Sequence, residues 1–265
     1  MRIVTCVRRA LDWNLSTKDF RIDAGTQQPV VSFARYRLDQ FDEIAVEVAL
    51  QARGRTPDIE VHALSIDARS GEDSLKQAIG MGASGATLVE CAVPADHPVP
   101  ALLAAAVLEM EYVEIVLCGR VGSERGSAVT APLIAELLGR PLVTNIVRME
   151  KHEQGWVCQR EAEHGYERVL VRGAFVASVT NASFNVPRVP TLKDKMHAHR
   201  QVVAIVPASS LASRPAYRPT AVVQPRILRR FVPQVARQGV RLAGDIGYQA
   251  QALADYIVNA VRTAQ

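Results

Sequence analysis

The clearest signal of the fold is the segment Val113-Glu114-Ile115-Val116-Leu117-Cys118, which is followed by Gly119-Arg120-Val121-Gly122-Ser123-Glu124-Arg125-Gly126-Ser127-Ala128. Its first six residues are a nearly continuous apolar run, which is typical of a strand buried on both faces at the centre of a parallel sheet. Glycine recurs three times in the next eight residues, and glycine lets the backbone turn tightly and approach a ligand closely. The segment therefore predicts a central strand whose carboxyl end opens into a loop.

Strands and helices alternate on both sides of this central run, as judged from hydrophobic periodicity. The predicted strands are Arg2–Val7, Ile59–Ile66, Ala86–Glu90 and Val143–Met149. The predicted helices are Asp39–Arg53, Glu72–Met81, Val99–Tyr112 and Ser127–Leu138. Strands separated by helices of this length need crossover connections, which place the strands in parallel. The predicted fold class is therefore α/β, with a doubly wound, mostly parallel sheet of the adenine-nucleotide-binding, Rossmann-like kind.

The pattern changes after residue 150. Trp156–Glu161 and Tyr166–Val171 read as a hairpin, Phe175–Thr180 as another strand, and Tyr248–Val261 as a closing helix. From Pro187 onward the chain is rich in proline and arginine, and such a segment cannot build a core of its own. We expect a nucleotide-binding domain over residues 1–200 and a C-terminal extension over 201–265 that packs on a partner subunit. The alternative for the extension is a solvated tail.

Composition narrows the class of protein. The 265 residues carry a net charge of +4, 48% hydrophobic and 22% charged residues, as in an ordinary globular protein. Aromatic residues make up 5%, which disfavours a nucleic-acid stacking platform. The four cysteines form no Cys-x-x-Cys pair, so reduced thiols are expected and zinc is not. No apolar run reaches the roughly 18 residues of a spanning helix, and we expect a cytoplasmic protein without membrane insertion.

The glycine loop has the chemistry of an anion site. At the carboxyl end of a parallel strand, the following helix presents free N–H groups and the positive end of its dipole. Ser123 and Ser127 can donate hydrogen bonds to phosphate, and Arg120 or Arg125 can neutralise its charge. The spacing matches neither Gly-x-Gly-x-x-Gly nor a P-loop. The alternative is a loop made flexible by glycine, with solvated arginines.

The carboxyl end of the first strand and the start of the first long helix border the same crevice. Asp39 can accept hydrogen bonds from a ribose or a base, or it is only the N-cap of the helix. Cys6 is small enough to admit a base, and equally suits a core. No nucleophile–base pair and no paired acids stand out among the residues, so we expect a bound cofactor, rather than side chains, to carry the chemistry.

Five segments resemble those of one known family, the beta subunits of electron-transfer flavoproteins. Ala78-Ile79-Gly80-Met81-Gly82-Ala83 is similar to its A-L-A-M-G-A-D, and residues 119–132 stand where it has G-K-Q-A-I-D-x-D-x-x-Q-x-G-P. Residues 3–9 together with Asp39-Gln40-Phe41-Asp42-Glu43-Ile44-Ala45-Val46-Glu47 resemble its opening, V-x-V-K-R-V … N-P-F-D-E-x-A-x-E. The most specific match is Asn185-x-Pro187-Arg188-x-x-Thr191-Leu192-x-x-x-Met196-x-Ala198, against N-E-P-R-Y-A-T-L-P-N-I-M-K-A.

The resemblance implies a heterodimeric carrier without side-chain catalysis, which takes electrons from flavin-dependent dehydrogenases to a quinone reductase. It implies an alpha subunit as partner, FAD held by or shared with that subunit, and AMP in the beta subunit. It assigns the nucleotide pocket to Cys6, Asp39, Gln40, Phe41, Ile66, Gly119, Arg120, Gly122, Ser123, Glu124, Gly126, Ser127, Ala128 and Thr130. It assigns docking on partner dehydrogenases to Leu192, Lys193, Lys195 and Met196, with Leu192 as the apolar anchor; a core position on a helix is the alternative for that leucine.

This chain departs from the family pattern in the loop and at the helix start. Arg120 and Val121 replace Lys-Gln, Glu124-Arg125-Gly126 replaces Asp-x-Asp, and Asp39-Gln40 replaces Asn-Pro. These changes indicate a divergent branch, and they leave open whether the pocket holds AMP, FAD or no nucleotide. Two other functions stay open: an electron-bifurcating beta subunit with its own FAD, and a stand-alone adenine-nucleotide-binding enzyme or sensor.

Overall fold

The computed structural model describes residues 1–12, 14, 16–92, 98–124, 126–215, 217, 228–232 and 239–263. These residues form two compact units. The larger one combines residues 1–20 with the described part of 31–226, and the smaller one combines residues 21–30 with the described part of 227–265.

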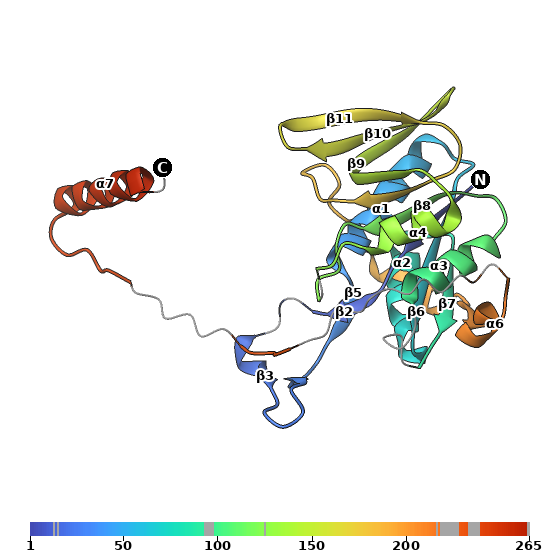
Figure 1. The fold of residues 1–265 in the computed structure, drawn as a ribbon, viewed down its shortest axis with the longest axis horizontal. Coiled ribbons are helices and arrows are strands. Elements are labelled where there is room, and N and C mark those ends of the chain that lie inside the picture. Colours follow the sequence, from blue (N-terminus) through green and yellow to red (C-terminus); the bar gives the residue numbers. More distant parts are fainter. Residues whose placement is uncertain are drawn as a thin grey trace. The chain divides into compact units, whose positions relative to one another are not determined.

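A nine-stranded sheet organises the larger unit, in the order β11-β10-β9-β12-β8-β1-β6-β7-β13. Figure 1 shows β11, β10 and β9 side by side. Its strands are β1 (Arg2–Cys6), β6 (Glu60–Asp67), β7 (Gly85–Glu90), β8 (Val113–Gly119), β9 (Leu142–His152), β10 (Gly155–Ala162), β11 (Gly165–Val171), β12 (Phe175–Val179) and β13 (Ala204–Pro207). Neighbouring strands pair in parallel along the series β12, β8, β1, β6, β7 and β13. At the other end of the sheet, β10 pairs antiparallel with β9 on one side and with β11 on the other.

The order of the strands reverses at β1, which lies between β6 and β8. Register pairs Cys6 of β1 with Leu64 on one side and with Cys118 on the other. After β1, the chain adds β6 and β7 on one side of β1, and it then adds β8 on the opposite side. In open parallel sheets, ligands bind at the carboxyl ends of the strands at such a reversal.

Two helical layers cover the sheet. On one face α1 (Gln40–Arg55), α2 (Glu72–Met81) and α5 (Leu192–Arg200) enclose a core that includes Ile3, Val61 and Ile115. On the other face α3 (Val99–Leu108), α4 (Thr130–Leu138) and α6 (Ala208–Ala212) enclose Val4 and Val116. Successive residues of one strand thus enter opposite cores, which explains why the central strands are apolar at nearly every position.

The predicted α/β fold class is confirmed, with differences in the bounds of its elements. Helix α4 begins at Thr130 rather than Ser127, because Ala128 has a φ of +55° and cannot belong to a right-handed helix. The sequence did not predict α5, β13 or α6. Both β13, which pairs in parallel with β7, and α6 lie beyond residue 200, the boundary predicted for the domain.

Short elements complete the larger unit and form the smaller one. In the larger unit, β2 (Arg9–Leu11) pairs with β5 (Tyr36–Leu38). The hairpin of β3 (Phe20–Ile22) and β4 (Pro29–Val31) follows the turn η1 (Thr17–Asp19). Its residues 21–30 belong to the smaller unit, in which Arg230 donates to the carbonyl of Gln27 and to Oε1 of Gln28. The turn η2 (Arg69–Gly71) precedes α2.

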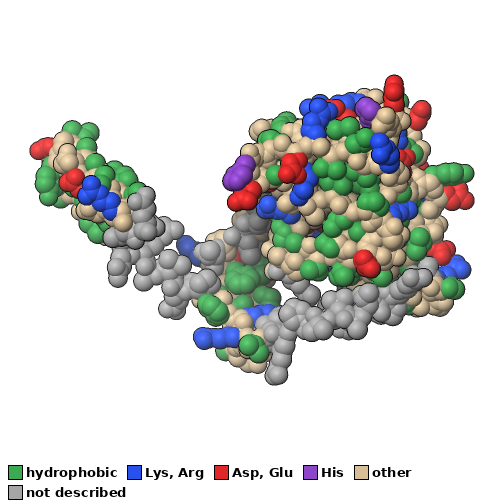
Figure 2. Space-filling model, turned by 45° about the horizontal axis from the view of Figure 1, so that its top comes forward, with side chains coloured by type: hydrophobic (Ala, Val, Ile, Leu, Met, Phe, Trp, Pro, Cys, Tyr) green, Lys and Arg blue, Asp and Glu red, His purple; other side chains and the backbone are tan. Residues whose placement is uncertain are grey.

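The smaller unit ends in α7 (Ile246–Thr263), whose surface bears hydrophobic side chains (Figure 2). Ile246, Leu253, Ile257 and Val261 are all at least half exposed and follow one another at helical spacing. Within the described residues, none of the helices is long and apolar enough to cross a membrane.

Candidate functional site

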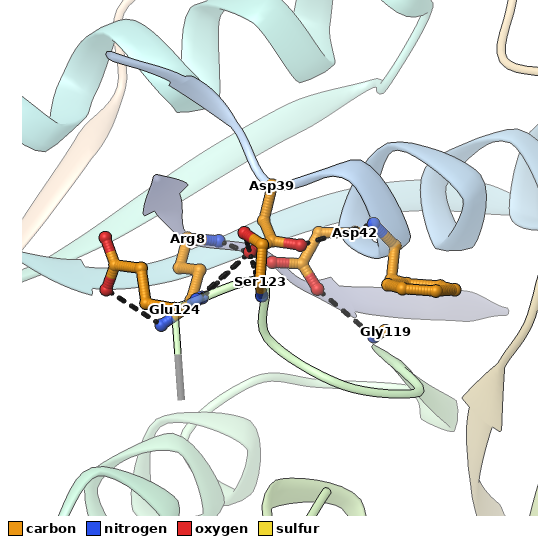
Figure 3. A network of polar contacts seen from close by, with 7 residues as sticks. Arg8, Asp39, Asp42, Gly119, Ser123 and Glu124 are labelled. Atoms are coloured by element: carbon orange, nitrogen blue, oxygen red, sulfur yellow. Dashed lines mark hydrogen bonds and ion pairs between the residues drawn. The ribbon is translucent and has the colours of Figure 1, made fainter. Parts of the chain in front are cut away.

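The candidate site lies where β1 and β8 end and α1 begins (Figure 3). Arg8 follows β1, Asp39 and Asp42 stand at the start of α1, and Ser123 and Glu124 lie in the loop after β8. These residues come from three distant parts of the sequence and point toward one another. The structure thereby brings together the strand end, helix start and glycine loop that the sequence placed around one crevice.

Asp39 is at the centre of this cluster and is fully buried, with an exposed fraction of 0%. Its Oδ2 accepts from Nε and Nη2 of Arg8, at 3.2 and 3.0 Å, and from the backbone N and Oγ of Ser123, at 2.9 and 2.5 Å. Its Oδ1 caps α1 by accepting from the backbone N of Phe41 at 3.3 Å. Asp39 is therefore both a helix cap and the tie between α1 and the loop.

Asp42 lies one turn further into α1 and is also buried. Its oxygens accept from the backbone N–H of Arg8 at 3.0 Å and of Gly119 at 3.2 Å, so it joins the ends of β1 and β8. Burial, followed by the nearby carboxylate of Asp39, raises the pKa of Asp42 to about 8. Asp42 is thus predominantly neutral at pH 7 and adds little charge to the site.

Gly119 is needed where the loop approaches α1, and Gly122 leaves room for the end of the Arg8 side chain. A Cβ on Gly119 would lie 2.5 Å from Oδ1 of Asp42, and one on Gly122 would lie 2.7 Å from the guanidinium carbon of Arg8. Both distances are shorter than real Cβ contacts. These glycines therefore serve close packing within the chain.

The far end of the loop is open. Gly126, Ser127 and Ala128 are exposed, Gly126 and Ala128 both have positive φ, and α4 begins without a side-chain cap. Exposed N–H groups at a helix N-terminus are suited to an anion such as phosphate. Thr130 is the first residue of α4, and Arg125 lies outside the described residues.

The other predicted pocket residues surround this cluster unevenly. Cys6 and Ile66 are buried at the ends of β1 and β6, whereas Gln40 is exposed. The guanidinium of Arg120 lies 5.2 Å from the centre of the Phe41 ring, a cation–π distance. A hydrogen bond with Cys6, together with burial, raises the pKa of the Cys118 thiol, so that thiol stays protonated. No three metal-ligating side chains gather within the part of the chain that the structure describes.

The predicted docking residues all lie on α5. A capping box starts this helix, because Thr191 and Asp194 bond to each other's backbone N–H and side chain. Leu192 is 76% exposed and Met196 is 53% exposed, one helical turn apart. The alternative core position for Leu192 is therefore wrong, and Lys193 and Lys195 are exposed as well.

The segment before α5 is held by two polar contacts that sequence reasoning missed. The buried amide of Asn185 donates to the carbonyls of Val147 and Thr180 and accepts from the backbone N of Ala182. The guanidinium of Arg188 donates to Glu47 of α1, from Nε at 2.7 Å and Nη2 at 3.0 Å. Two of the segments that resemble the family, 39–47 and 185–198, thus bind each other although Glu47 and Arg188 lie 141 residues apart in the sequence. The only signal that could have predicted this contact was the presence of oppositely charged residues in both segments.

A cleft of about 550 Å³ lies beside α5. It is bounded by the turn that ends α2 at Gly82, by the chain at Arg188–Pro190, and by Asp194 and His197 of α5. The cleft therefore borders the predicted docking residues rather than the glycine loop.

Comparison with known proteins gives one consistent result. The family described as "Electron transfer flavoprotein domain" matches residues 30–211. An "Electron transfer flavoprotein subunit beta" from Syntrophomonas wolfei subsp. wolfei is 27% identical over 265 residues, which cover 99% of this chain and 98% of the relative. One from Bacillus subtilis is 25% identical, covering 83% and 85%. The "Caffeyl-CoA reductase-Etf complex subunit CarD" from Acetobacterium woodii is 25% identical, covering 92% of each.

Proposed function

The chain belongs to the electron transfer flavoprotein domain family, and on this premise we propose that it is the beta subunit of a heterodimeric electron carrier. The observation that carries the proposal is the alignment with a beta subunit over 99% of this chain, which includes the C-terminal segment. In this proposal the redox chemistry belongs to an FAD held by, or shared with, the alpha subunit. This chain supplies packing, the site at the ends of β1 and β8, and a docking helix.

We propose that α5 is the surface that meets flavin-dependent dehydrogenases on one side of the reaction and a quinone reductase on the other. Exposed Leu192 and Met196 provide an apolar anchor, and Lys193 and Lys195 surround it with positive charge. An apolar centre carries binding energy, while charges speed encounter. Such an interface suits a carrier that must bind and release several partners.

The extension predicted over residues 201–265 begins with β13 and α6, which belong to the larger unit, and we propose that its C-terminal part packs on the alpha subunit through α7. Ile246, Leu253, Ile257 and Val261 form an exposed apolar stripe on that helix. A stripe of this width on a solvated helix is unfavourable unless another surface covers it. The covering surface proposed here is the alpha subunit.

An electron-bifurcating beta subunit with its own FAD is the second candidate. The 25% identity to CarD, a subunit of a caffeyl-CoA reductase-Etf complex, favours it. A stand-alone nucleotide-binding enzyme or sensor is less well supported, because it leaves exposed α5 and its supporting contacts without a use.

The test is to co-express this chain with a candidate alpha subunit and to purify the complex. The complex is then denatured, and the released small molecules are identified by mass spectrometry. A stable heterodimer with one FAD is expected of the simple carrier, and two FAD would identify the bifurcating kind. A chain that forms no heterodimer and retains no flavin would contradict the proposal.

A further inference from the structure

We propose that this chain closes the adenosine side of its nucleotide site with its own side chains, and that this contact replaces a bound AMP as the support of the loop after β8. The contact consists of Arg8, Asp39, Ser123 and Glu124, and is called the clasp below. The inference rests on the proposed function, since it concerns the site that the family resemblance assigns to AMP.

Asp39 presents no accessible acceptor to a ribose. Its Oδ2 receives four donors from Arg8 and Ser123, its Oδ1 receives the N–H of Phe41, and the side chain is fully buried. A ribose hydroxyl would have to displace charge-assisted hydrogen bonds, which are about twice as strong as neutral ones. Asparagine, the residue of the family pattern at this position, could not draw an arginine in the same way, because it has no charge.

The loop also lies directly against the elements that would surround an adenosine. The guanidinium of Arg8 occupies the space next to Gly122, and Asp42 with Phe41 occupies the space next to Gly119. A nucleoside would need the loop to move away from α1.

The charge of Arg8 is already used within the chain. Arg8 faces two carboxylates, Asp39 at 3.0 Å and Glu124 at 3.5 Å. Because these carboxylates neutralise it, the guanidinium of Arg8 offers no free positive charge to a nucleotide. The open end of the loop at Gly126–Thr130 is compatible with a phosphate group, but the adenosine part has no free partner at the clasp.

The experiment uses the purified heterodimer and AMP as the probe. After denaturation, mass spectrometry is expected to find flavin and no stoichiometric AMP. Addition of 1 mM AMP (a concentration ~1,000 times a micromolar Kd) is expected to leave the Tm unchanged, whereas a nucleotide of that affinity would raise the Tm by about 10 °C. One AMP per heterodimer, or such a rise in Tm, would overturn the inference.

The variant Asp39→Asn tests the clasp itself. It keeps the shape of the side chain and removes the charge that holds Arg8 and Ser123. Limited trypsin digestion, followed through cleavage after Arg120, is expected to be about tenfold faster or more, because the loop opens more often. An unchanged cleavage rate would also overturn the inference.

Glu60→Gln is the matched control. Arg2 donates from Nε and Nη2 to Oε2 of Glu60, at 3.1 and 3.0 Å, which repeats the geometry of Arg8 on Asp39 at the opposite end of β1. This variant is expected to leave cleavage after Arg120 unchanged. Because the cleavage is read on this chain, its result is distinguishable from failure of the proposed function, which would show as loss of heterodimer and flavin.

Discussion

Removal of the tie between Arg188 and Glu47 should destabilise the protein in a way that depends on which partner is removed. The Glu47 side chain is 7% exposed and that of Arg188 is 45% exposed. In Arg188→Met, Glu47 keeps two donors among the described residues, Gln51 Nε2 and the backbone N–H of residue 188, and it remains buried with its charge. In Glu47→Gln, the half-exposed side chain of Arg188 can turn to water, so this variant should lose less stability.

The magnitudes follow from the burial of each partner. Breaking a fully buried ion pair by removing one partner costs about 3–5 kcal/mol. Because Arg188 is nearly half exposed and screened by solvent, we expect about 2–3 kcal/mol for Arg188→Met and about 1 kcal/mol for Glu47→Gln. For a domain of this size, the first value corresponds to a fall in Tm of roughly 5–10 °C.

The assay is thermal and denaturant unfolding of both variants as a function of pH. Although burial by itself would raise it, the hydrogen bonds from Arg188 bring the folded pKa of Glu47 below its ordinary value of 4.5. A depressed acid pKa contributes stability above the unfolded pKa and loses it as the pH falls through the folded one. The difference in the free energy of unfolding between wild type and Arg188→Met should therefore be at its full value at pH 7 and should shrink below about pH 4.5.

Arg55→Met is the control. Arg55 lies on α1, as Glu47 does, and it forms an ion pair with Glu150 in which both side chains are well exposed. Such a pair contributes less than about 1 kcal/mol, so its removal should leave the Tm nearly unchanged. Equal effects of Arg188→Met and Arg55→Met on the Tm, or an effect of Arg188→Met that is undiminished at pH 3, would show that the buried ion pair does not stabilise the protein.

Three further outcomes are expected. Asn185→Ala leaves a buried N–H and two carbonyls without partners and should cost about 2–3 kcal/mol by denaturant unfolding; an unchanged midpoint would contradict that role. For wild type, stability should fall as the pH rises from about 4 to about 8 because folded Asp42 keeps a proton that the unfolded chain releases, and a Tm profile of Asp42→Asn should lack this fall. Leu192→Ala should leave the Tm unchanged, since Leu192 is exposed, but weaken binding to a partner dehydrogenase by about 30-fold (~2 kcal/mol) in a titration.

Several features of the fold could be predicted from local pattern. The apolar run Val113–Cys118 became β8, which is bonded on both sides, and its position in the middle of the sheet follows from burial on both faces. Helix α5 was missed because Pro187 and Pro190 precede it and its residues are mostly polar. What starts it is the capping box of Thr191 and Asp194, a short signal that is easily overlooked in a proline-rich segment.

Local pattern was enough to predict which segments meet at the candidate site, because parallel strands carry their loops to one edge of the sheet. What the side chains of those segments bind depends on the folded chain. Asp39 was interpreted as a ribose acceptor or as a helix cap; it is the cap, and it also accepts from Ser123, 84 residues away, while Glu47 pairs with Arg188, 141 residues away. Periodicity reports which side of an element is buried, but a buried carboxylate takes whichever donor the folded chain brings within about 3 Å, and that choice has no local signature.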